Sequence, residues 1–222
     1  GIIYLKIKNS RKLLSEISYK FIKKDVKKLI AVTGTNGKSS VADFYYQILN
    51  LSKKRVASIG TIGVQSKNKK KEIENTTLNP IKLSKLINVL NLKKIDHIIL
   101  EASSHGLKQN RLDGLLFDLG IFTNLSHDHL DYHKNFRNYL NSKLYLFKYL
   151  IKKRGYVILD STIPQFKEIK KISIQKKLKL ETVFGKNSDL ELVEHSYINE
   201  HQNLKIKYKS QVFEITLNLI GK

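Results

Sequence analysis

The stretch LIAVTGTNGKSS, residues 29–40, determines the fold class that we expect for this chain. Residues 29–32 are apolar and typical of a buried strand, and the run TGTNGKSS follows them directly. The apolar spacing from Val41 to Ile48 then predicts a helix over about 38–51. A strand, a glycine loop and a helix in this order present backbone N–H groups and a helix N-terminus to an anion. We therefore expect this loop to bind phosphate.

Two side chains of the loop suit a nucleoside triphosphate. Lys38 adds a point charge for the β- and γ-phosphates, and Ser39 offers a hydroxyl group to Mg²⁺. The loop departs from the pattern G-x-x-x-x-G-K-[ST], because Val32 stands at the place of the first glycine. A glycine-rich turn without function is the alternative, and the order of strand, loop and helix argues against it. The sequence therefore predicts binding of ATP or GTP.

Strand-like and helical runs alternate on both sides of this loop. The strand-like runs lie at 55–59, 97–102, 118–123 and 156–160, and the helical runs at 81–92 and 135–151. Pro80 and Pro164 each mark an expected helix start. This alternation predicts an α/β fold with a mainly parallel sheet and flanking helices. Beyond Leu180, the runs ETVFG, LKIKYK and VFEITLNL predict an antiparallel extension of the sheet.

The first 25 residues differ from the rest. Residues 2–7 resemble a strand, 10–22 an amphipathic helix, and 23–25 a polar linker. The chain begins at Gly1 and contains no Met, so we expect it to be a piece of a longer protein.

Composition restricts the possible partners and compartments. The chain has 41 Lys and Arg residues against 19 Asp and Glu residues, a formal net charge of +22. The lysines are spread along the whole sequence, which favours a solvated basic surface over a nucleic-acid-binding face. No apolar run approaches the roughly 18 residues of a membrane span, and the N-terminus lacks the order of a signal peptide. With no Cys, thiolate metal sites and disulfides are excluded, and we expect a soluble cytoplasmic protein.

The segment LEASSHGL, residues 100–107, leaves the end of a predicted buried strand. Glu101 then lies at the carboxyl edge of the sheet, where α/β folds hold their ligands. A carboxylate there, beside a phosphate-binding loop, suits a metal that bridges to the nucleotide. A capping or salt-bridged carboxylate is the alternative.

The segment FTNLSHDHLDYH, residues 122–133, contains three His and two Asp. Its His127-x-His129-x-Asp131 spacing is similar to the H-x-H-x-D-H signature of binuclear metallo-hydrolases, which would make it a zinc site. Tyr132 interrupts that signature, and a hydrolase has no use for the glycine loop, so the zinc interpretation is the weaker one. We expect His127 and His133 to be structural or surface residues.

Together these motifs resemble the ATP-dependent Mur ligases of peptidoglycan synthesis and, among them, the UDP-N-acetylmuramoyl-tripeptide synthetases. The matching motifs are GTNGKSS, GTIG (60–63), NTT (75–77), EASSHGLKQNR (101–111), FTNLSHDHLDYH and the SK of NYLNSKLYLF. The resemblance implies that residues 1–25 end an N-terminal uridine-binding domain and that 26–222 form the central ATP-binding domain. A C-terminal amino-acid-binding domain is then absent, and we expect the fragment alone to be inactive.

The resemblance also implies a reaction. The D-Glu carboxylate of UDP-N-acetylmuramoyl-L-Ala-D-Glu attacks the γ-phosphate of ATP, and an amino acid amine then attacks the acyl phosphate. The third amino acid stays open between diaminopimelate, lysine and others, because the domain that selects it is missing. A monomer without nucleic-acid or membrane partners is expected.

Site residues follow from the same resemblance. The residues that match the ATP-phosphate contacts are Gly34, Thr35, Asn36, Gly37, Lys38, Ser39 and Ser40. Those that match the muramoyl-dipeptide contacts are Asn75, Thr76, Thr77, Ser103, Gln109 and Arg111. Ser39 matches a ligand of one Mg²⁺, and Glu101 with His129 the ligands of another. Lys38, His129 and Lys143 match catalytic residues.

Lys143 matches a lysine that the family carbamylates with CO₂. A carbamate converts a cation into an anion with oxygen donors, which are the ligands that Mg²⁺ prefers. By its residue type alone, Lys143 would be interpreted as a solvated helix lysine.

Two alternatives remain. Folylpolyglutamate synthase shares the GTNGK loop and a carbamylated lysine, although SSHGL and DHLDYH favour the Mur ligases. A basic nucleic-acid-binding module with a relic phosphate loop is the second, and a steep salt dependence of DNA binding would indicate it.

Overall fold

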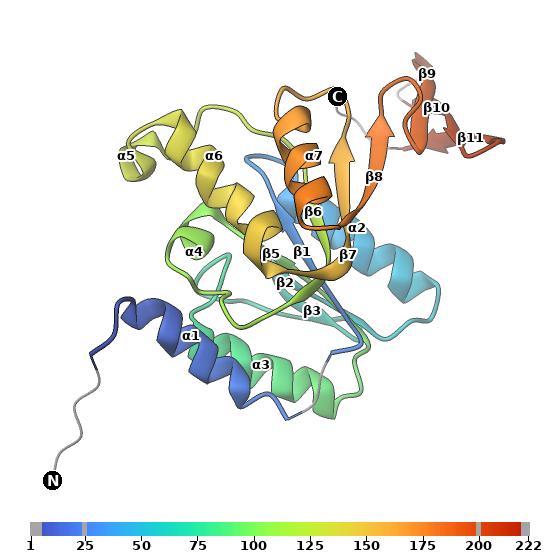
Figure 1. Ribbon diagram of the computed structural model, residues 1–222. Helices are drawn as coiled ribbons and strands as arrows, with labels where there is room; N and C mark the ends of the chain where they lie inside the picture. The colour runs from blue at the N-terminus through green and yellow to red at the C-terminus, as the bar shows by residue number, and fades with distance from the viewer. Residues whose placement is uncertain (1–5, 24–25, 199–200, 219–222) are drawn as a thin grey trace, which may run out of the picture.

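The computed structural model describes residues 6–23, 26–198 and 201–218. Within these residues, one mixed sheet of eleven strands runs through the molecule in the order β11-β10-β9-β8-β7-β6-β1-β5-β2-β3-β4. Helices cover both of its faces (Figure 1). None of the helices in the described ranges has the length and apolar character that a bilayer crossing requires.

The centre of the sheet is parallel, as the alternation of strands and helices predicts. Its strands are β1 (Lys28–Thr33), β2 (Val56–Gly60), β5 (His97–Glu101), β6 (Phe117–Phe122), β7 (Ile151–Asp160) and β8 (Lys179–Phe184). β1 lies between β5 and β6 and pairs in parallel with both. Five of its six residues are buried, since helices lie on both sides of it. The α/β prediction is therefore confirmed.

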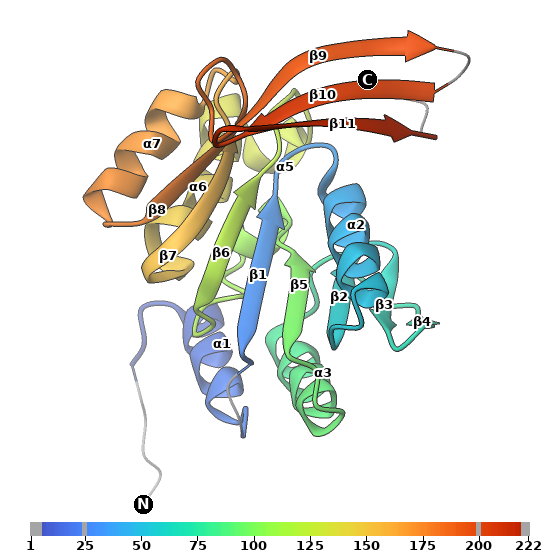
Figure 2. The same cartoon turned by 90° about the vertical axis from the view of Figure 1, so that its right-hand side faces the viewer.

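The helices divide between the two faces. Only α2 (Lys38–Leu51) packs on the face formed by Ile30, Val32 and Ile99 in the described chain. The opposite face carries the main core and most of the other helices (Figure 2). These are α1 (Ser10–Lys20), α3 (Pro80–Leu92), α4 (Ser104–Lys108), α6 (Phe136–Tyr145), the π-helix η1 (Leu146–Leu150) and α7 (Phe166–Gln175). A short helix, α5 (Leu130–His133), precedes α6.

Several boundaries differ from the expectations. The helix expected at 135–151 is split, because η1 replaces its last turn and β7 begins at once with Ile151. The helix expected from Pro164 begins at Phe166, and the one expected at 10–22 ends at Lys20. Lys6 and Ile7 are not in a strand, while residues 2–5 and 24–25 lie outside the described residues.

Both edges of the sheet are antiparallel. At one edge, β3 (Gly63–Ser66) and β4 (Lys69–Lys71) continue from β2 as unexpected hairpins. At the other edge, β9 (Leu190–Ile198), β10 (His201–Tyr208) and β11 (Gln211–Leu217) form the expected antiparallel extension. The assignment of ETVFG to that extension is wrong. Residues 181–184 of this run lie in β8, which is parallel to β7 because α7 provides the crossover that a parallel pair requires. β8 also pairs in parallel with the first two residues of β9.

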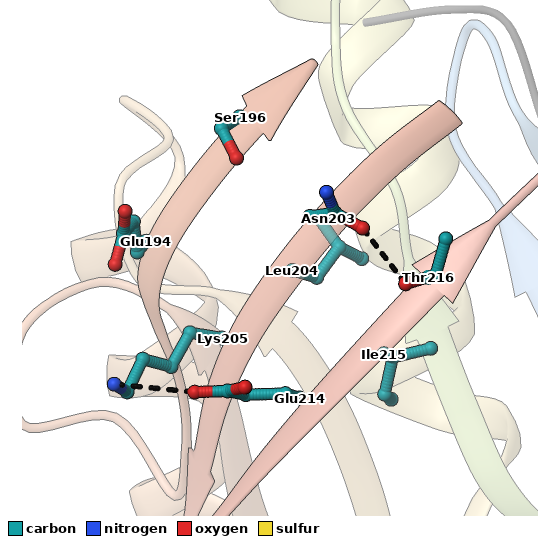
Figure 3. A pocket seen from close by; sticks show the side chains of 8 residues that line it. All are labelled: Glu194, Ser196, Asn203, Leu204, Lys205, Glu214, Ile215 and Thr216. Atoms are coloured by element: carbon teal, nitrogen blue, oxygen red, sulfur yellow. Dashed lines mark hydrogen bonds and ion pairs between the residues drawn. The ribbon is translucent and has the colours of Figure 1, made fainter. Parts of the chain in front are cut away.

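The extension formed by β9, β10 and β11 reaches across the carboxyl end of the parallel strands (Figure 2). One of its faces is polar (Figure 3): Lys205 Nζ lies 3.4 Å from Glu214 Oε1, and Thr216 donates a 2.7 Å hydrogen bond to Asn203. On the other face, the register places Leu204 beside Ile215 and Ile206 beside Phe213. This unit therefore has one polar and one apolar side.

Candidate functional site

The glycine loop, residues 34–40, connects β1 to α2 at the carboxyl end of the sheet. Gly37 has φ +80° and is the N-cap of α2, a left-handed conformation that favours glycine. Gly34 has φ +150°, and a Cβ atom there would lie 1.9 Å from Thr123 Oγ1. Gly37 is therefore required for its backbone conformation, and Gly34 for its conformation and for lack of space.

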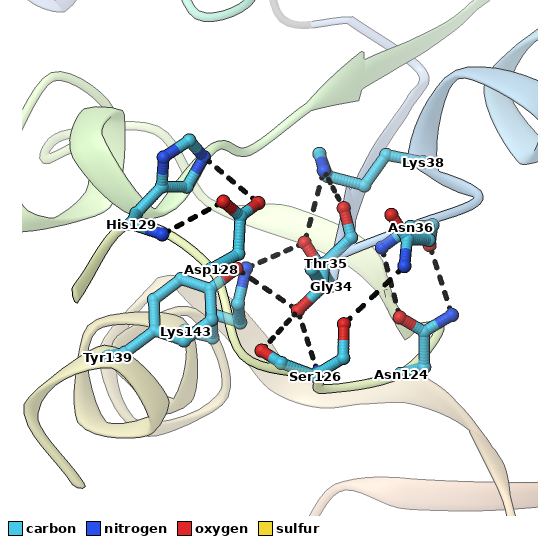
Figure 4. A network of polar contacts seen from close by, with 10 residues as sticks. All are labelled: Gly34, Thr35, Asn36, Lys38, Asn124, Ser126, Asp128, His129, Tyr139 and Lys143. Atoms are coloured by element: carbon cyan, nitrogen blue, oxygen red, sulfur yellow. Dashed lines mark hydrogen bonds and ion pairs between the residues drawn. The ribbon is translucent and has the colours of Figure 1, made fainter. Parts of the chain in front are cut away.

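A second segment, residues 123–126, holds this loop from the side (Figure 4). The Asn36 N–H donates to Asn124 Oδ1 at 2.9 Å, and Thr123 Oγ1 donates to the Asn36 carbonyl at 2.6 Å. Thr35 Oγ1 accepts from the Ser126 N–H at 3.0 Å. Sequence reasoning assigned no role to these residues. Their signal was position, since TNLS directly follows β6, the neighbour of β1.

Two lysines converge on one carbonyl oxygen of the loop (Figure 4). Lys143 Nζ donates to the Gly34 carbonyl at 2.6 Å, while Lys38 Nζ donates to the same oxygen at 3.1 Å and to the Thr35 carbonyl at 2.7 Å. Lys143 is only 1% exposed, and its ammonium lies 4.3 Å from the centre of the Tyr139 ring. It is therefore not a solvated helix lysine.

The environment of these lysines changes their acidity. Burial and, to a smaller extent, the nearby charge of Lys38 lower the pKa of Lys143 to about 7, and the carboxylate of Asp128 opposes them. Burial also lowers the pKa of Lys38, and the carboxylates of Glu101 and Asp128 oppose that effect. At neutral pH, a substantial fraction of Lys143 is consequently an uncharged amine.

Glu101 ends β5 and faces the first turn of α2. Its side chain is 1% exposed and accepts hydrogen bonds from Ser39 Oγ at 3.0 Å and from the Thr61 N–H at 2.8 Å. A Cβ atom on Gly60 would lie 2.0 Å from Glu101 Oε1, so the GTIG glycine leaves room for this carboxylate. The structure thus brings Ser39 and Glu101 together, and both offer oxygen atoms, the donors that Mg²⁺ prefers.

A connected group of polar side chains lies next to Glu101. Thr77 Oγ1 donates to the Glu101 carbonyl at 2.7 Å and lies 3.0 Å from Ser103 Oγ. Arg111 donates to the Thr77 carbonyl at 2.6 Å and to Gln109 Oε1 at 3.0 Å. We call this group the Arg111 network; its members are Thr76, Thr77, Ser103, Gln109 and Arg111. Thr76 joins it through Thr61, at 2.9 Å, whereas Asn75 is exposed at its margin.

His129 is the N-cap of α5 and has φ +50°, and its Nε2 lies 3.3 Å from Asp128 Oδ2. His127 instead stacks on Phe136, with ring centres 5.1 Å apart. In the ranges that the structure describes, no three His, Cys, Asp or Glu side chains form a group able to hold a metal ion. The geometry therefore does not support the zinc interpretation.

His133 is 2% exposed, and neither of its ring nitrogens has a hydrogen-bond partner. Burial lowers its pKa to about 4, so the ring is neutral at pH 7. It packs against His105 and Tyr139. This agrees with the structural role expected for His133.

Comparison with known proteins identifies relatives over the whole chain. The family model described as Mur ligase middle domain matches residues 32–222. UDP-N-acetylmuramoyl-L-alanyl-D-glutamate--2,6-diaminopimelate ligases from Chelativorans sp. (strain BNC1) and Rickettsia montanensis are 34% and 38% identical over 221 and 224 residues. These alignments cover 100% and 99% of the chain and 46% of each relative, so the chain spans about half the length of these curated relatives.

Solved structures share the fold. A UDP-N-acetylmuramoyl-L-alanyl-D-glutamate--2,6-diaminopimelate ligase superposes with a TM-score of 0.86 at 24% identity, over 95% of this chain and 44% of that one. The apo form of L. casei FPGS superposes with a TM-score of 0.76 at 12% identity, over 100% of this chain and 60% of that one. Since the family model matches every residue from Val32 to the end of the chain, the chain belongs to the Mur ligase family, in which it is a middle domain.

Proposed function

We propose that this domain serves a ligase that joins 2,6-diaminopimelate to UDP-N-acetylmuramoyl-L-alanyl-D-glutamate with the energy of ATP. The observation that carries the proposal is the convergence of Lys38 and Lys143 on the Gly34 carbonyl, beside the Ser39–Glu101 pair. Two lysine side chains and one carboxylate thus lie close to the N-terminus of a helix. This arrangement suits the transfer of a phosphoryl group, which depends mainly on positioning and charge neutralisation.

In this proposal, the glycine loop binds the phosphates of ATP. Its backbone N–H groups and the N-terminus of α2 face the anion, with Gly34, Thr35, Asn36, Gly37, Lys38, Ser39 and Ser40 as the contacting residues. The Lys38 ammonium leaves its carbonyl partners to neutralise charge on the γ-phosphate. The loop is already held in shape by residues 123–126, so little ordering is needed on binding.

The donor set fits Mg²⁺. Ser39 would hold one ion, and Glu101 together with His129 would hold a second ion, with Ser39 Oγ and the Glu101 carboxylate 3.0 Å apart. When bound, Mg²⁺ neutralises and orients phosphate oxygens. The contribution of this chain is to keep the Glu101 carboxylate aimed at Ser39, through the Thr61 N–H and the space above Gly60.

Lys143 is proposed to carry a carbamate. Its neutral amine, favoured by the lowered pKa, attacks the carbon of CO₂. The C–N bond forms as one C=O π bond opens and its electron pair passes to oxygen, and one N–H proton is lost. The resulting anion would replace a repulsive positive charge close to Lys38 with a negative one.

The Arg111 network is proposed to bind the muramoyl-dipeptide. The guanidinium of Arg111 suits a carboxylate or phosphate, because its planar fork binds two oxygens at once. Its position beside Glu101 brings the D-Glu carboxylate of this substrate towards the γ-phosphate. The carboxylate would then attack the γ-phosphorus, the bond to the bridging oxygen would break, and ADP would leave behind an acyl phosphate. The amine of diaminopimelate would attack the acyl carbon, phosphate would leave, and loss of a proton from nitrogen would give the amide.

The choice of diaminopimelate rests on the names of the similar ligases, which are 34% and 38% identical to this chain. The folylpolyglutamate synthase alternative has weaker support, since the L. casei FPGS structure shares the fold at only 12% identity.

The test is ligation by the complete protein. Purified protein is incubated with Mg²⁺, ATP, UDP-N-acetylmuramoyl-L-Ala-D-Glu and either meso-diaminopimelate or L-lysine, and the products are identified by mass spectrometry. We expect ADP and the diaminopimelate-containing tripeptide. Product with lysine alone would refute the amino acid assignment, and no ATP-dependent amide with either would refute the ligase.

A further inference from the structure

The buried residues of helix α1 all carry hydroxyl groups, while two of its large apolar side chains are exposed together with its basic residues. Its buried residues are Ser15, Ser18 and Tyr19, whereas Leu14 is 46% and Ile17 45% exposed. Burial of polar groups is unfavourable unless they form hydrogen bonds. The inner face of α1 therefore serves to make specific hydrogen bonds more than to bury apolar surface.

Those hydrogen bonds reach the two backbone carbonyl groups that lie before and after the Cα atom of Arg111. Ser15 Oγ donates to the Asn110 carbonyl at 2.5 Å, and Tyr19 OH donates to the Arg111 carbonyl at 2.5 Å. Asn9, the N-cap of α1, donates from its side chain to Asn110 Oδ1 at 3.0 Å. Two consecutive carbonyl groups of one loop are thus fixed by one helix that precedes the matched family region, residues 32–222.

The loop also fits closely against α1. A Cβ atom on Gly114, which has φ +98°, would lie 2.9 Å from the Cα atom of Glu16. Asn110 has φ +57°, in the left-handed region that Asn tolerates better than most residues. The bonds from Asn9 and Ser15 support this conformation.

The same backbone carries the guanidinium of the Arg111 network. The Arg111 N–H donates to the Gly106 carbonyl at 2.9 Å, and its side chain ends on Thr77 and Gln109. With the N–H held by α4 and the carbonyl held by α1, both ends of this residue are fixed. The direction in which its side chain leaves the backbone follows from these two attachments.

We infer that Ser15 and Tyr19 are positioning residues for Arg111 and thereby set the affinity of the site for an anionic, carboxylate-bearing substrate. The inference rests on the proposed function, in which Arg111 holds the muramoyl-dipeptide. A helix outside the matched family region thus orders one side of the binding site in advance, which lowers the entropy that the substrate must lose on binding.

Matched substitutions in the complete protein test this. Tyr19→Phe removes only the hydroxyl group that holds Arg111, and Tyr46→Phe removes the hydroxyl of another buried tyrosine, which accepts from the Asn68 N–H. Ser15→Ala has Ser18→Ala as its control, since Ser18 donates only to the Leu14 carbonyl of its own helix. Thermal midpoints of all four variants report any general loss of stability.

We expect Tyr19→Phe and Ser15→Ala to raise the KM for UDP-N-acetylmuramoyl-L-Ala-D-Glu by about three- to tenfold, the equivalent of one lost hydrogen bond. The kcat and the KM for ATP should not change, because uniform binding of one substrate is what is lost. In an Arg111→Ala background, Tyr19→Phe should have no further effect on KM, because it acts through Arg111.

The outcomes separate the two claims. If the unaltered protein ligates, and if Tyr19→Phe and Tyr46→Phe have the same KM for UDP-N-acetylmuramoyl-L-Ala-D-Glu, the inference is wrong. The proposed function would not be affected by that result. Additive effects of Tyr19→Phe and Arg111→Ala would also overturn it. No ligation by the unaltered protein would overturn the proposed function, and the inference with it.

Discussion

The glycine loop and the Arg111 network lie on either side of Glu101, and they are held in different ways. In the loop, the ammonium groups of Lys38 and Lys143 rest on backbone carbonyls that they share. In the network, Thr77, Ser103 and Arg111 are held by one another and by the backbone of neighbouring segments. In the proposed function, the loop would provide movable charges for a reacting phosphate, whereas the network would provide a fixed surface that recognises the substrate. Changes in the loop should affect kcat, and changes in the network should affect KM.

The largest effect is expected from Lys38→Ala. Loss of the ammonium that neutralises the transferred phosphoryl group should lower kcat by at least about 100-fold, as in comparable sites. Steady-state ligation assays measure this, with Lys85→Ala on the exposed side of α3 as the control. Near-normal turnover in a folded Lys38→Ala variant would contradict the expectation that changes in the loop affect kcat.

Lys143→Ala should also reduce kcat strongly, with partial recovery in acetate or formate. The side chain is 1% exposed, so its removal leaves buried space next to Gly34 where a small carboxylate can replace the carbamate oxygens. Rescue is measured as kcat against carboxylate concentration. Lys38→Ala is the control that should show none, and full activity of Lys143→Ala without additives would contradict the assignment.

Gly60→Ala tests the carboxylate between the two regions. The new Cβ atom would lie 2.0 Å from Glu101 Oε1 and displace the side chain that faces Ser39. We expect the Mg²⁺ concentration for half-maximal rate to rise about tenfold. Gly185→Ala is a matched control, because its Cβ atom would lie 2.1 Å from Ser161 Oγ, on another loop. An equal Mg²⁺ requirement in the two variants would exclude Glu101 from the metal site.

His133 should make the domain sensitive to acid. Its pKa is about 4 in the folded protein, below the 6.5 of a free imidazole, so between these values the unfolded chain binds a proton that the native state does not. Stability is therefore lost as the pH falls from 6.5 towards 4. Urea unfolding at pH 7.5 and pH 5 should show a smaller loss for His133→Phe. An unchanged pH dependence in this variant would contradict the assignment.

The smallest effect is expected from Lys205→Ala, in the extension formed by β9, β10 and β11. Its exposed ion pair with Glu214 should contribute less than about 1 kcal/mol to stability. The kinetic constants should stay the same, because this pair belongs to neither the loop nor the network. A change in kcat or KM would indicate that the extension contributes to the site, as a third region beside the loop and the network.

Local sequence signals were sufficient wherever the structure is determined locally. The helix at Lys38–Leu51 was predicted, at about 38–51, because the apolar spacing marks its inner face. Glu101 was also predicted to lie beside the glycine loop, since the carboxyl edge of the sheet is where α/β folds hold their ligands.

Features that depend on distant segments were not predictable in this way. The burial of Lys143 depends on the Gly34 carbonyl, 109 residues away in the sequence, so residue type alone indicated a surface lysine. The β3–β4 hairpin was missed because KNKKK is polar throughout. The polar inner face of α1 is similarly invisible, since the carbonyl groups that it binds belong to residues 110 and 111.

The shared Gly34 carbonyl oxygen couples the protonation of the two lysines. Because Lys38 and Lys143 donate to the same atom and each charge disfavours the other, any event that discharges Lys143 makes protonation of Lys38 easier. Thermodynamic reciprocity requires the converse: an anion that stabilises the charge on Lys38 must also alter the tendency of Lys143 to lose its own. In the proposed function, CO₂ uptake by Lys143 and nucleotide binding beside Lys38 would therefore be coupled, and each should depend on the concentration of the other ligand.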